Sequence, residues 1–433
     1  LALAPPVGGL PLAAYAAVAL LLIGGIACVP AAVGLLLERV RPARDPLWLL
    51  ASERARRLRS TATVAVAGVV ASLSLAVALT VMVTSFRAAV SDWLDVVLPA
   101  DLYVRTAGGA AAEAAWLPPE LAAAAAALPG VARVEGLRAL PVALDGLAPG
   151  QPAPTLIARP LADPARSLPL LGELQPAPAG ATVVYASEAL ALLHGAAAGR
   201  SLALTLPLPE GGSRRVEVFV AGLWRDYARQ HGALVMAAPD YRALTGDERL
   251  NDLALTLAPG ADAAAVQQRL RALAPEPALL EFASASEIRA LSLRIFDRSF
   301  AVTWWLQAVA IVIGLVGIAA SFSAQVLARR KEFGVLVHLG FTRTQVLAVV
   351  AGEGLAWTAA GTLLGLALGV AVSVVLVHVV NPQSFHWTME LLLPWGRLAA
   401  LAAAVLVAGT LTAAVAARRS VARSAVLAVK EDW

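Results

Sequence analysis

The chain has 433 residues, 59% of them hydrophobic, and a mean hydropathy of +0.73, which excludes an ordinary soluble globular protein. Its formal net charge is only +4, but the basic residues are unevenly placed along the chain. The single cysteine, Cys28, lies inside an apolar run and excludes an intrachain disulfide.

Five apolar segments are long enough to cross a bilayer as helices, for which about 20 residues suffice. They are Leu12–Leu37, Thr61–Phe86, Phe300–Leu327, Val346–Val380 and Trp395–Ala417. The runs are too long for β-barrel strands and do not alternate strictly between apolar and polar residues. We therefore predict a mainly α-helical transmembrane bundle of five spans.

The basic residues predict the orientation of these spans. The connections Glu38–Ser60, Ala328–Gln345 and Arg418–Trp433 carry 7, 4 and 4 lysines and arginines, whereas Asn381–Pro394 carries none. Because short basic loops stay in the cytoplasm, the first three connections are predicted to be cytoplasmic and the fourth extracytoplasmic. The chain then starts outside, and the long segment between the second and third spans is also outside.

That long segment, residues 87–299, is large enough to form a domain. Seven short runs have the composition of strands: Leu102–Arg105, Val131–Val134, Thr155–Ala158, Val183–Tyr185, Leu202–Leu206, Val216–Val220 and Leu253–Leu257. Three other runs favour helices: Leu121–Leu128, Ser187–Leu193 and Ala261–Leu273. Pro- and Gly-rich loops are expected at Ala148–Pro154 and Pro207–Gly212. The sequence predicts an α+β extracytoplasmic domain.

Both flanks of the domain have helical periodicity. Phe86, Val90, Trp93 and Val97 recur at helical spacing after the second span, and Ile288–Phe296 repeats the pattern before the third. A helix from residue 286 to residue 327 would be about 60 Å long, twice the thickness of the membrane core. We expect two paired stalk helices under the domain; two separate surface helices are the alternative.

Residues 38–60 contain an amphipathic segment that starts at Asp45. Trp48 is followed by Arg54, Arg56, Arg57 and Arg59, an arrangement typical of a helix in the membrane interface. Lipid anchoring is the predicted role of this segment.

The connection 328–345 joins the third and fourth predicted spans and reads ARRKEFGVLVHLGFTRTQ. Its charge marks the cytoplasmic side, and its apolar positions (Phe333, Leu336, Val337) suggest that it packs against something. A topology signal alone is the simpler interpretation of the residues themselves.

The fourth predicted span contains Gly361, Gly365 and Gly369 at four-residue intervals, a spacing that lets a second helix approach closely, within this chain or in a partner. Glycine is also simply common in membrane helices. Glu353 is the only acid in this span. We expect it to form a structural ion pair, with Arg343 as the candidate partner, rather than to couple protons.

Enzyme motifs are missing from the sequence. The only lysines, Lys331 and Lys430, are each followed by glutamate, so the Walker A lysine motif is absent. The five histidines show no paired metal spacing, and Gly-x-Ser-x-Gly is absent. His378, His386 and Trp387 are interpreted as interfacial anchors. No catalytic or metal-binding residue is assigned, and no substrate-binding residue is identified.

The residues of the connection resemble the RRxEFGxLxxLG loop of FtsX-like ABC transporter permeases, the MacB/LolCE-type family also called type VII ABC transporters. The order of one span, a large outer domain and three spans is similar as well. Within the outer domain, Val183–Leu206 resembles a frequent strand, SEALA helix and strand pattern of that family.

The resemblance implies a division of the chain into functional parts. Residues 1–37 are expected to form an extra transmembrane helix, residues 38–60 a cytoplasmic loop with an interfacial helix, and residues 61–86 a transmembrane helix. Residues 87–299 would form the outer domain with its stalk helices. Residues 300–417 would form an FtsX-like three-helix transmembrane domain with the coupling loop 328–345, and residues 418–433 a cytoplasmic tail.

The resemblance also implies a multi-pass permease of the cell (inner) membrane, whose partner ATPase uses ATP and Mg and moves the outer domain. Lipoprotein, lipid, peptide or drug would be exported or extracted. The alternative is a division-type FtsX-like scaffold that regulates a cell-wall hydrolase.

By the same resemblance, the ATPase-coupling residues are Arg329, Arg330, Lys331, Glu332, Phe333, Gly334, Leu336, Gly340 and Thr342. The expected partners are an ABC ATPase, membrane lipid, a second permease half or a second copy, and a lipoprotein or periplasmic adaptor, with no nucleic acid. The start at Leu1 and the extra first span suggest the C-terminal half of a duplicated ten-span permease.

Overall fold

The structure is a computed structural model, and it describes residues 2–6, 10–39, 45–57, 59–106, 116–117, 119–147, 151–273 and 280–423. The side chains at 59–62, 65, 318, 322, 330, 331, 333 and 419–423 are outside this description. The chain divides into two compact units. The helical unit comprises residues 1–86, 298–380 and 389–433, and the outer unit comprises residues 87–297 and 381–388.

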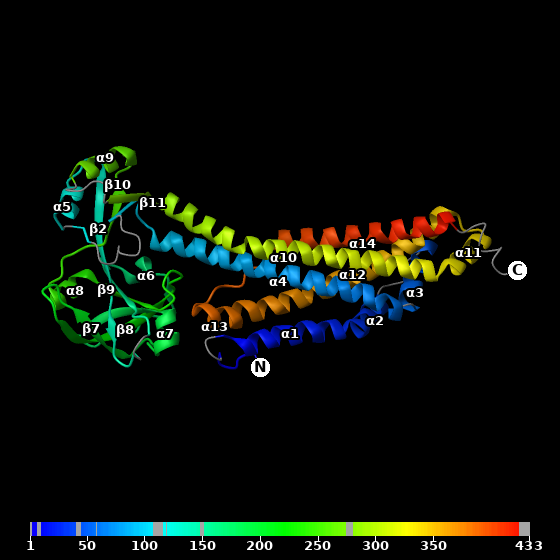
Figure 1. Ribbon diagram of the computed structural model, residues 1–433, viewed down its shortest axis with the longest axis horizontal. Coiled ribbons are helices and arrows are strands. Elements are labelled where there is room, and N and C mark those ends of the chain that lie inside the picture. The colour runs from blue at the N-terminus through cyan, green and yellow to red at the C-terminus, as the bar shows by residue number, and fades with distance from the viewer. Residues whose placement is uncertain are drawn as a thin grey trace. The chain divides into compact units, whose positions relative to one another are not determined.

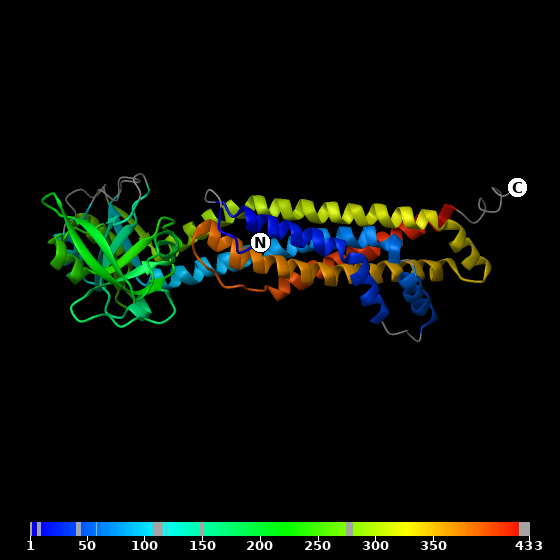
Figure 2. The ribbon, with the colours of Figure 1, turned by 90° about the horizontal axis from the view of Figure 1, so that it is seen from below.

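The helical unit is built from long apolar helices. The helices are α1 (Leu12–Ala27), α2 (Val29–Arg39), α3 (Pro46–Arg57), α4 (Arg59–Val97), α10 (Ala285–Ala328), α11 (Arg330–His338), α12 (Arg343–Val375) and α14 (Trp395–Arg423). In both views α4, α10, α12 and α14 run side by side, while α2 and α3 diverge from that direction (Figures 1 and 2). Parts of α4 and α10 also belong to the outer unit.

Four stretches of the described chain are long and apolar enough to cross a membrane: Val66–Val97, Ala285–Ala328, Arg343–Phe385 and Trp395–Arg418. The pair α1 and α2 makes a fifth if it is counted as one span. The predicted number of five spans therefore depends on this pair.

The predicted first span, Leu12–Leu37, is not one straight helix. It breaks at Cys28, where α1 and α2 meet with a bend of 50°. Pro30 accounts for the break, because proline has no N–H to donate to the carbonyl of Ile26 and its ring clashes with the preceding turn. Cys28 is exposed at this bend.

The predicted fourth span is longer than expected. After α12 the chain forms a π-helical turn, Leu376–Val380, and a short helix α13, Asn381–Phe385. Pro382 lies just after the π-helical turn, where it has no N–H to donate to a carbonyl of that turn. His386, at φ 63°, takes the left-handed conformation that ends the helix. The loop predicted from Asn381 thus begins at His386.

The glycine stripe of α12 packs against α4. A Cβ atom added at Gly361 would lie 3.1 Å from Val69 Cβ, and one at Gly365 would lie 3.1 Å from Leu73 Cβ. At Gly369 it would lie 2.8 Å from the carbonyl oxygen of Ser74. Contacts that advance together along both helices show that α4 and α12 are parallel. The close approach is therefore made within this chain.

In the outer unit, the described residues form one mixed sheet of eleven strands. The strands are β1 (Leu102–Thr106), β2 (Val131–Pro141), β3 (Ala143–Leu144), β4 (Thr155–Arg159), β5 (Leu170–Leu171), β6 (Thr182–Ser187), β7 (Ser201–Pro207), β8 (Ser213–Trp224), β9 (Ala233–Ala237), β10 (Asp252–Leu257) and β11 (Leu280–Ser284). Their order is β11-β1-β10-β2-β4-β9-β6-β8-β7-β3, with β5 on β8. All seven predicted strands are present; β3, β5, β9 and β11 were not predicted.

The helices of the outer unit cover two parts of this sheet. They are α5 (Pro119–Ala126), α6 (Pro164–Ser167), α7 (Glu188–His194), α8 (Ala238–Thr245) and α9 (Ala263–Leu273). Figure 1 shows α5 and α9 beside β2 and β10, and α7 and α8 on the other part. The long strand β2 joins the parts, because it pairs with β10 up to Leu137 and with β4 from Arg138. Residues 148–150 of one predicted loop lie outside the described residues.

The ends of α4 and α10 that belong to the outer unit are tied together. Arg87 Nε lies 3.1 Å from Asp297 Oδ1, and Arg289 pairs with Asp95. Just beyond these helices, β1 and β11 pair antiparallel. The two flanking helices thus enter the sheet through adjacent strands.

Candidate functional site

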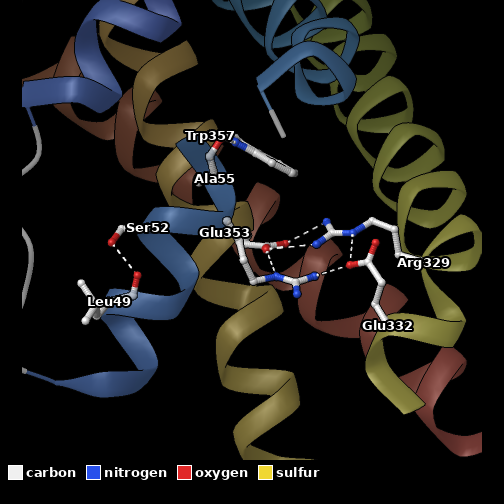
Figure 3. Close-up of polar contacts among 8 residues, drawn as sticks. Leu49, Ser52, Ala55, Arg329, Glu332, Glu353 and Trp357 are labelled. Carbon is white, nitrogen blue, oxygen red and sulfur yellow. Dashed lines mark hydrogen bonds and ion pairs between the residues drawn. The ribbon is translucent and has the colours of Figure 1, made fainter. Parts of the chain in front are cut away.

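Four charged side chains from three helices and one helix junction form a closed set in the helical unit. We call Arg54, Arg329, Glu332 and Glu353 the charge ring (Figure 3). Arg54 contacts Glu353 Oε1 at 2.6 Å and Glu332 Oε2 at 3.0 Å. Arg329 contacts Glu353 Oε2 at 3.1 Å and Glu332 Oε2 at 3.3 Å. Each arginine therefore bridges both glutamates.

The ring has a buried end and an exposed end. The Glu353 side chain, on α12, is 3% exposed, and Glu332, on α11, is 51% exposed. Arg54 on α3 and Arg329, between α10 and α11, are 17% and 12% exposed. Because two positive charges balance two negative ones, the buried carboxylate is compensated. The ring ties α11 to both α3 and α12.

Close packing of α3 on α12 places Arg54 in the ring. A Cβ atom added at Gly352 would lie 3.0 Å from Ala51 Cβ, so the glycine leaves room for α3. Trp357 Nε1 donates to the carbonyl of Ala55 at 3.2 Å (Figure 3). Arg54, which lies between Ala51 and Ala55 on α3, is thereby held beside Glu353.

One sequence prediction is corrected by this arrangement. Among the described residues, Glu353 pairs with Arg54 and Arg329 and not with Arg343. Two arginines of α3 contact protein, since Arg54 joins the ring and Arg56 Nε donates to the carbonyl of Leu37 at 2.8 Å; lipid anchoring by this helix stays a prediction. The sequence showed a basic run, but not which arginine faces the protein.

The predicted coupling residues lie on α11 and its two ends. Arg329 and Glu332 belong to the ring, and Leu336 packs on an apolar cluster with Val326 and Val346. Gly340, at φ 96°, ends α11 in a left-handed conformation, and Thr342 caps α12 in a capping box with Gln345. The backbone of Arg330, Lys331, Phe333 and Gly334 is helical; the side chains of the first three lie outside the described residues.

Exposed apolar side chains lie on α11 and at its C-terminal end. Val335 on the helix and Leu339, its C-cap residue, are four residues apart and are 58% and 71% exposed; Glu332, 51% exposed, lies about one turn before Val335. This helix lies outside the stretches that qualify as membrane spans. An exposed apolar stripe beside a charge on a non-spanning helix is a surface that a protein partner can bury.

A second constellation lies in the outer unit, where residues 381–388, the outer segment, contact the domain. The Trp387 ring centroid lies 4.5 Å from that of Tyr227, which lies 5.7 Å from that of Trp93 on α4. Tyr227 Oη donates to the carbonyl of Thr388 at 3.2 Å, and the Thr388 N–H donates to Glu188 Oε2 at 2.9 Å.

Trp387 is 4% exposed, so it packs on protein and is not the interfacial anchor that was predicted. The outer segment is thus fixed to the loop after β8 and to the first turn of α7. Burial lowers the pKa of the nearby His386, and the charge of His231 lowers it further.

A buried ionic network stabilises the junction between the two parts of the sheet. Arg138 Nε on β2 lies 3.1 Å from Asp247 Oδ2, and Arg249 Nε lies 2.6 Å from Asp247 Oδ1. Tyr241 Oη also donates to Asp247. Burial alone would raise the pKa of Asp247, but these hydrogen bonds and the charge of Arg138 lower it to about 2. Across the described part of the chain, no group of three or more His, Cys, Asp and Glu residues is placed to hold a metal ion.

Two protein-family models match this chain. The model of the FtsX-like permease C-terminal region matches residues 306–425, and that of the MacB-like periplasmic core domain matches residues 62–273. An uncharacterized ABC transporter permease protein of Mycobacterium tuberculosis is 28% identical over 359 residues. The match covers 80% of this chain, which spans 40% of that protein's length.

Two solved structures are similar to less than half of this chain. The periplasmic region of MacB from Actinobacillus actinomycetemcomitans has a TM-score of 0.33 and 10% identity, covering 45% of this chain and 93% of that one. The extracellular domain of the noncanonic ABC-type transporter YknZ from Gram-positive bacteria has a TM-score of 0.29 and 9% identity, covering 42% and 98%. Together the two family models cover most of the chain, which therefore combines an FtsX-like permease C-terminal region with a MacB-like periplasmic core domain.

Proposed function

We propose that this permease couples ATP hydrolysis by a separate ABC ATPase to movement of its extracytoplasmic domain. The partner would use ATP and Mg, and this chain would supply no catalytic group. The work would be export or extraction of a lipoprotein, lipid, peptide or drug across or from the cell (inner) membrane. A second permease half or a second copy would complete the transporter.

The exposed apolar face of α11 carries this proposal. Val335 and Leu339 present about one helical turn of apolar surface outside the candidate spans, and Glu332 adds a charge beside it. The charge ring ties this helix to α12 through the buried Glu353. A displacement of α11 by the ATPase would therefore be transmitted to α12 through these ionic contacts as well as through the connection between the two helices.

Two routes would pass such a push to the outer domain. The first is the pair α4 and α10, which we propose as the stalk and which are cross-linked by the pairs Arg87–Asp297 and Arg289–Asp95. The second is the outer segment, which follows the π-helical turn after α12 and is held by Tyr227 and Glu188. The MacB-like domain match favours this mechanism over a scaffold that regulates a cell-wall hydrolase.

Co-purification tests the proposed ATPase contact. The chain is co-expressed with the ABC ATPase encoded beside its own gene, and the ATPase retained on the tagged permease is measured. Val335→Asp places a charge on the apolar face without touching the ring, and we expect it to abolish retention. Glu332→Arg should also reduce retention, because it reverses a charge on the same face.

Leu192→Asp is the matched control, because Leu192 is 57% exposed on α7 in the outer unit. It should retain the ATPase fully. Full retention by Val335→Asp and Glu332→Arg would count against α11 as the contact.

A further inference from the structure

An apolar cavity opens between four helices of the helical unit. It measures about 350 Å³ and is lined by residues of α2, α3, α12 and α14. On α12 these include Leu355, Ala359 and Leu363, which repeat every four residues along one side. The polar side-chain atoms of the lining belong to Ser52, whose hydroxyl donates to the carbonyl of Leu49 at 3.0 Å (Figure 3), and to the indole N–H of Trp48. The other lining side chains are aliphatic, so the cavity offers a ligand mainly hydrocarbon contact.

A second, polar cavity of about 320 Å³ adjoins the first. It is lined by Gly34, Leu37, Glu38, Arg56 and Arg57, and Leu37 lines both cavities.

The face of α3 also connects the two cavities. Trp48 and Ser52 line the apolar cavity and Arg56 lines the polar one, at successive four-residue steps along a single helical face. An apolar slot thus continues into a basic mouth.

The arginines at the mouth differ in what they already bind. Arg56 donates to the carbonyl of Leu37 and pairs with Glu53 at 2.6 Å, so it holds α3 against the end of α2. Arg57 is exposed, and no contact to it is found among the described residues. Glu38 is the acid in the lining. Because Arg56 is already paired, Arg57 is the guanidinium of the mouth that is directed to solvent.

We propose that this composite site binds one acidic phospholipid, with an acyl chain in the apolar cavity and the phosphate headgroup at Arg57. Inside a membrane the surrounding hydrocarbon fills an apolar slot, and arginine at its mouth selects a negative headgroup. Trp48 beside the slot is the residue type found at headgroup level. The bent pair α1 and α2 and the α3 helix would then be held on the bundle partly by a bound lipid.

Native mass spectrometry of the intact chain, released from nanodiscs of equal phosphatidylglycerol and phosphatidylcholine, tests the site. Ala359→Trp fills the apolar cavity and should abolish the retained lipid. Its control is Ala308→Trp, at an exposed position of α10. Arg57→Gln, at an exposed position, should lower the preference for phosphatidylglycerol about fivefold, the effect of one arginine near a charged surface. Arg418→Gln, also exposed, is its control.

Unchanged lipid retention in Ala359→Trp would overturn the proposal, as would an unchanged headgroup preference in Arg57→Gln. A helix of a second copy in the cavity is the competing occupant. In that case Ala359→Trp would convert the complex of two copies into single chains and leave the retained lipid unchanged. That result would also overturn the proposal. None of these measurements uses an ATPase, so their failure leaves the proposed function standing.

Discussion

Replacing Glu353 with glutamine removes the buried charge of the ring and keeps the shape of the side chain. The Glu353 carboxylate is 3% exposed and is contacted by both arginines at 2.6 to 3.3 Å. Loss of one partner of a buried ion pair costs about 3–5 kcal/mol, because the opposite charge stays buried without compensation. Arg54 and Arg329 are still 17% and 12% exposed, so we expect Glu353→Gln to lower the free energy of unfolding by an amount near the lower end of that range.

Glu332→Gln removes the same charge at the exposed end of the ring and serves as the control. Its side chain is 51% exposed, and an exposed ion pair contributes only about 0.2–1 kcal/mol. In thermal unfolding of the purified chain in detergent, the unfolding midpoints of wild type and Glu332→Gln should therefore be close together, and the midpoint of Glu353→Gln should be well below both.

A double variant gives a second check on the same reasoning. Arg54→Gln combined with Glu353→Gln should be less destabilised than the sum of the two single variants, because the two residues contact each other directly. Equal unfolding midpoints for the Glu353 and Glu332 variants would refute the assigned burial of the ring.

Three further outcomes are expected. Gly369→Val should lower stability by about 1–3 kcal/mol in the same unfolding assay, because its side chain meets the backbone of α4; Gly24→Val, with open space at its Cβ, should not. Since the pKa of Asp247 is lowered from its ordinary 3.8 to about 2, it contributes about 2 kcal/mol above pH 4, lost as the pH falls through 2; Asp247→Asn should flatten that dependence in acid unfolding. Tyr227→Phe removes the bond to Thr388, worth about 1 kcal/mol, and hydrogen exchange should rise at residues 381–388 but not on β6.

The strands with alternating or β-branched sequence were predictable, because their pattern is local. Val131–Val134 and Val216–Val220 were found at the right places but are only parts of the longer strands β2 and β8. The missed strand β9, Ala233–Ala237, is an unbroken apolar run between β4 and β6, and such a run does not distinguish a buried strand from a helix. Its neighbours lie far away in the sequence.

The candidate site was predictable only in part, for a similar reason. The basic residues at 329–331 and the acid at 353 stand out in the sequence, but Arg54 is one of four arginines within six residues. Which of them meets Glu353 depends on the packing of Ala51 against Gly352. The docking of Trp387 on Tyr227 joins residues 160 positions apart, and a tryptophan at a membrane boundary has a simpler local interpretation.

The position of β1 in the sheet has a consequence for biosynthesis. Both neighbours of β1, β10 and β11, lie near the end of the domain sequence. At roughly 5–20 residues per second, the ribosome needs roughly 10 to 35 s to proceed from β1 to β11. Until β10 has been made, Leu102–Thr106 has two unpaired edges, and it keeps one until β11 follows, a condition that favours pairing with other chains. The nascent outer domain would therefore need shelter, by the translocation machinery or a chaperone, until its last strand has been made.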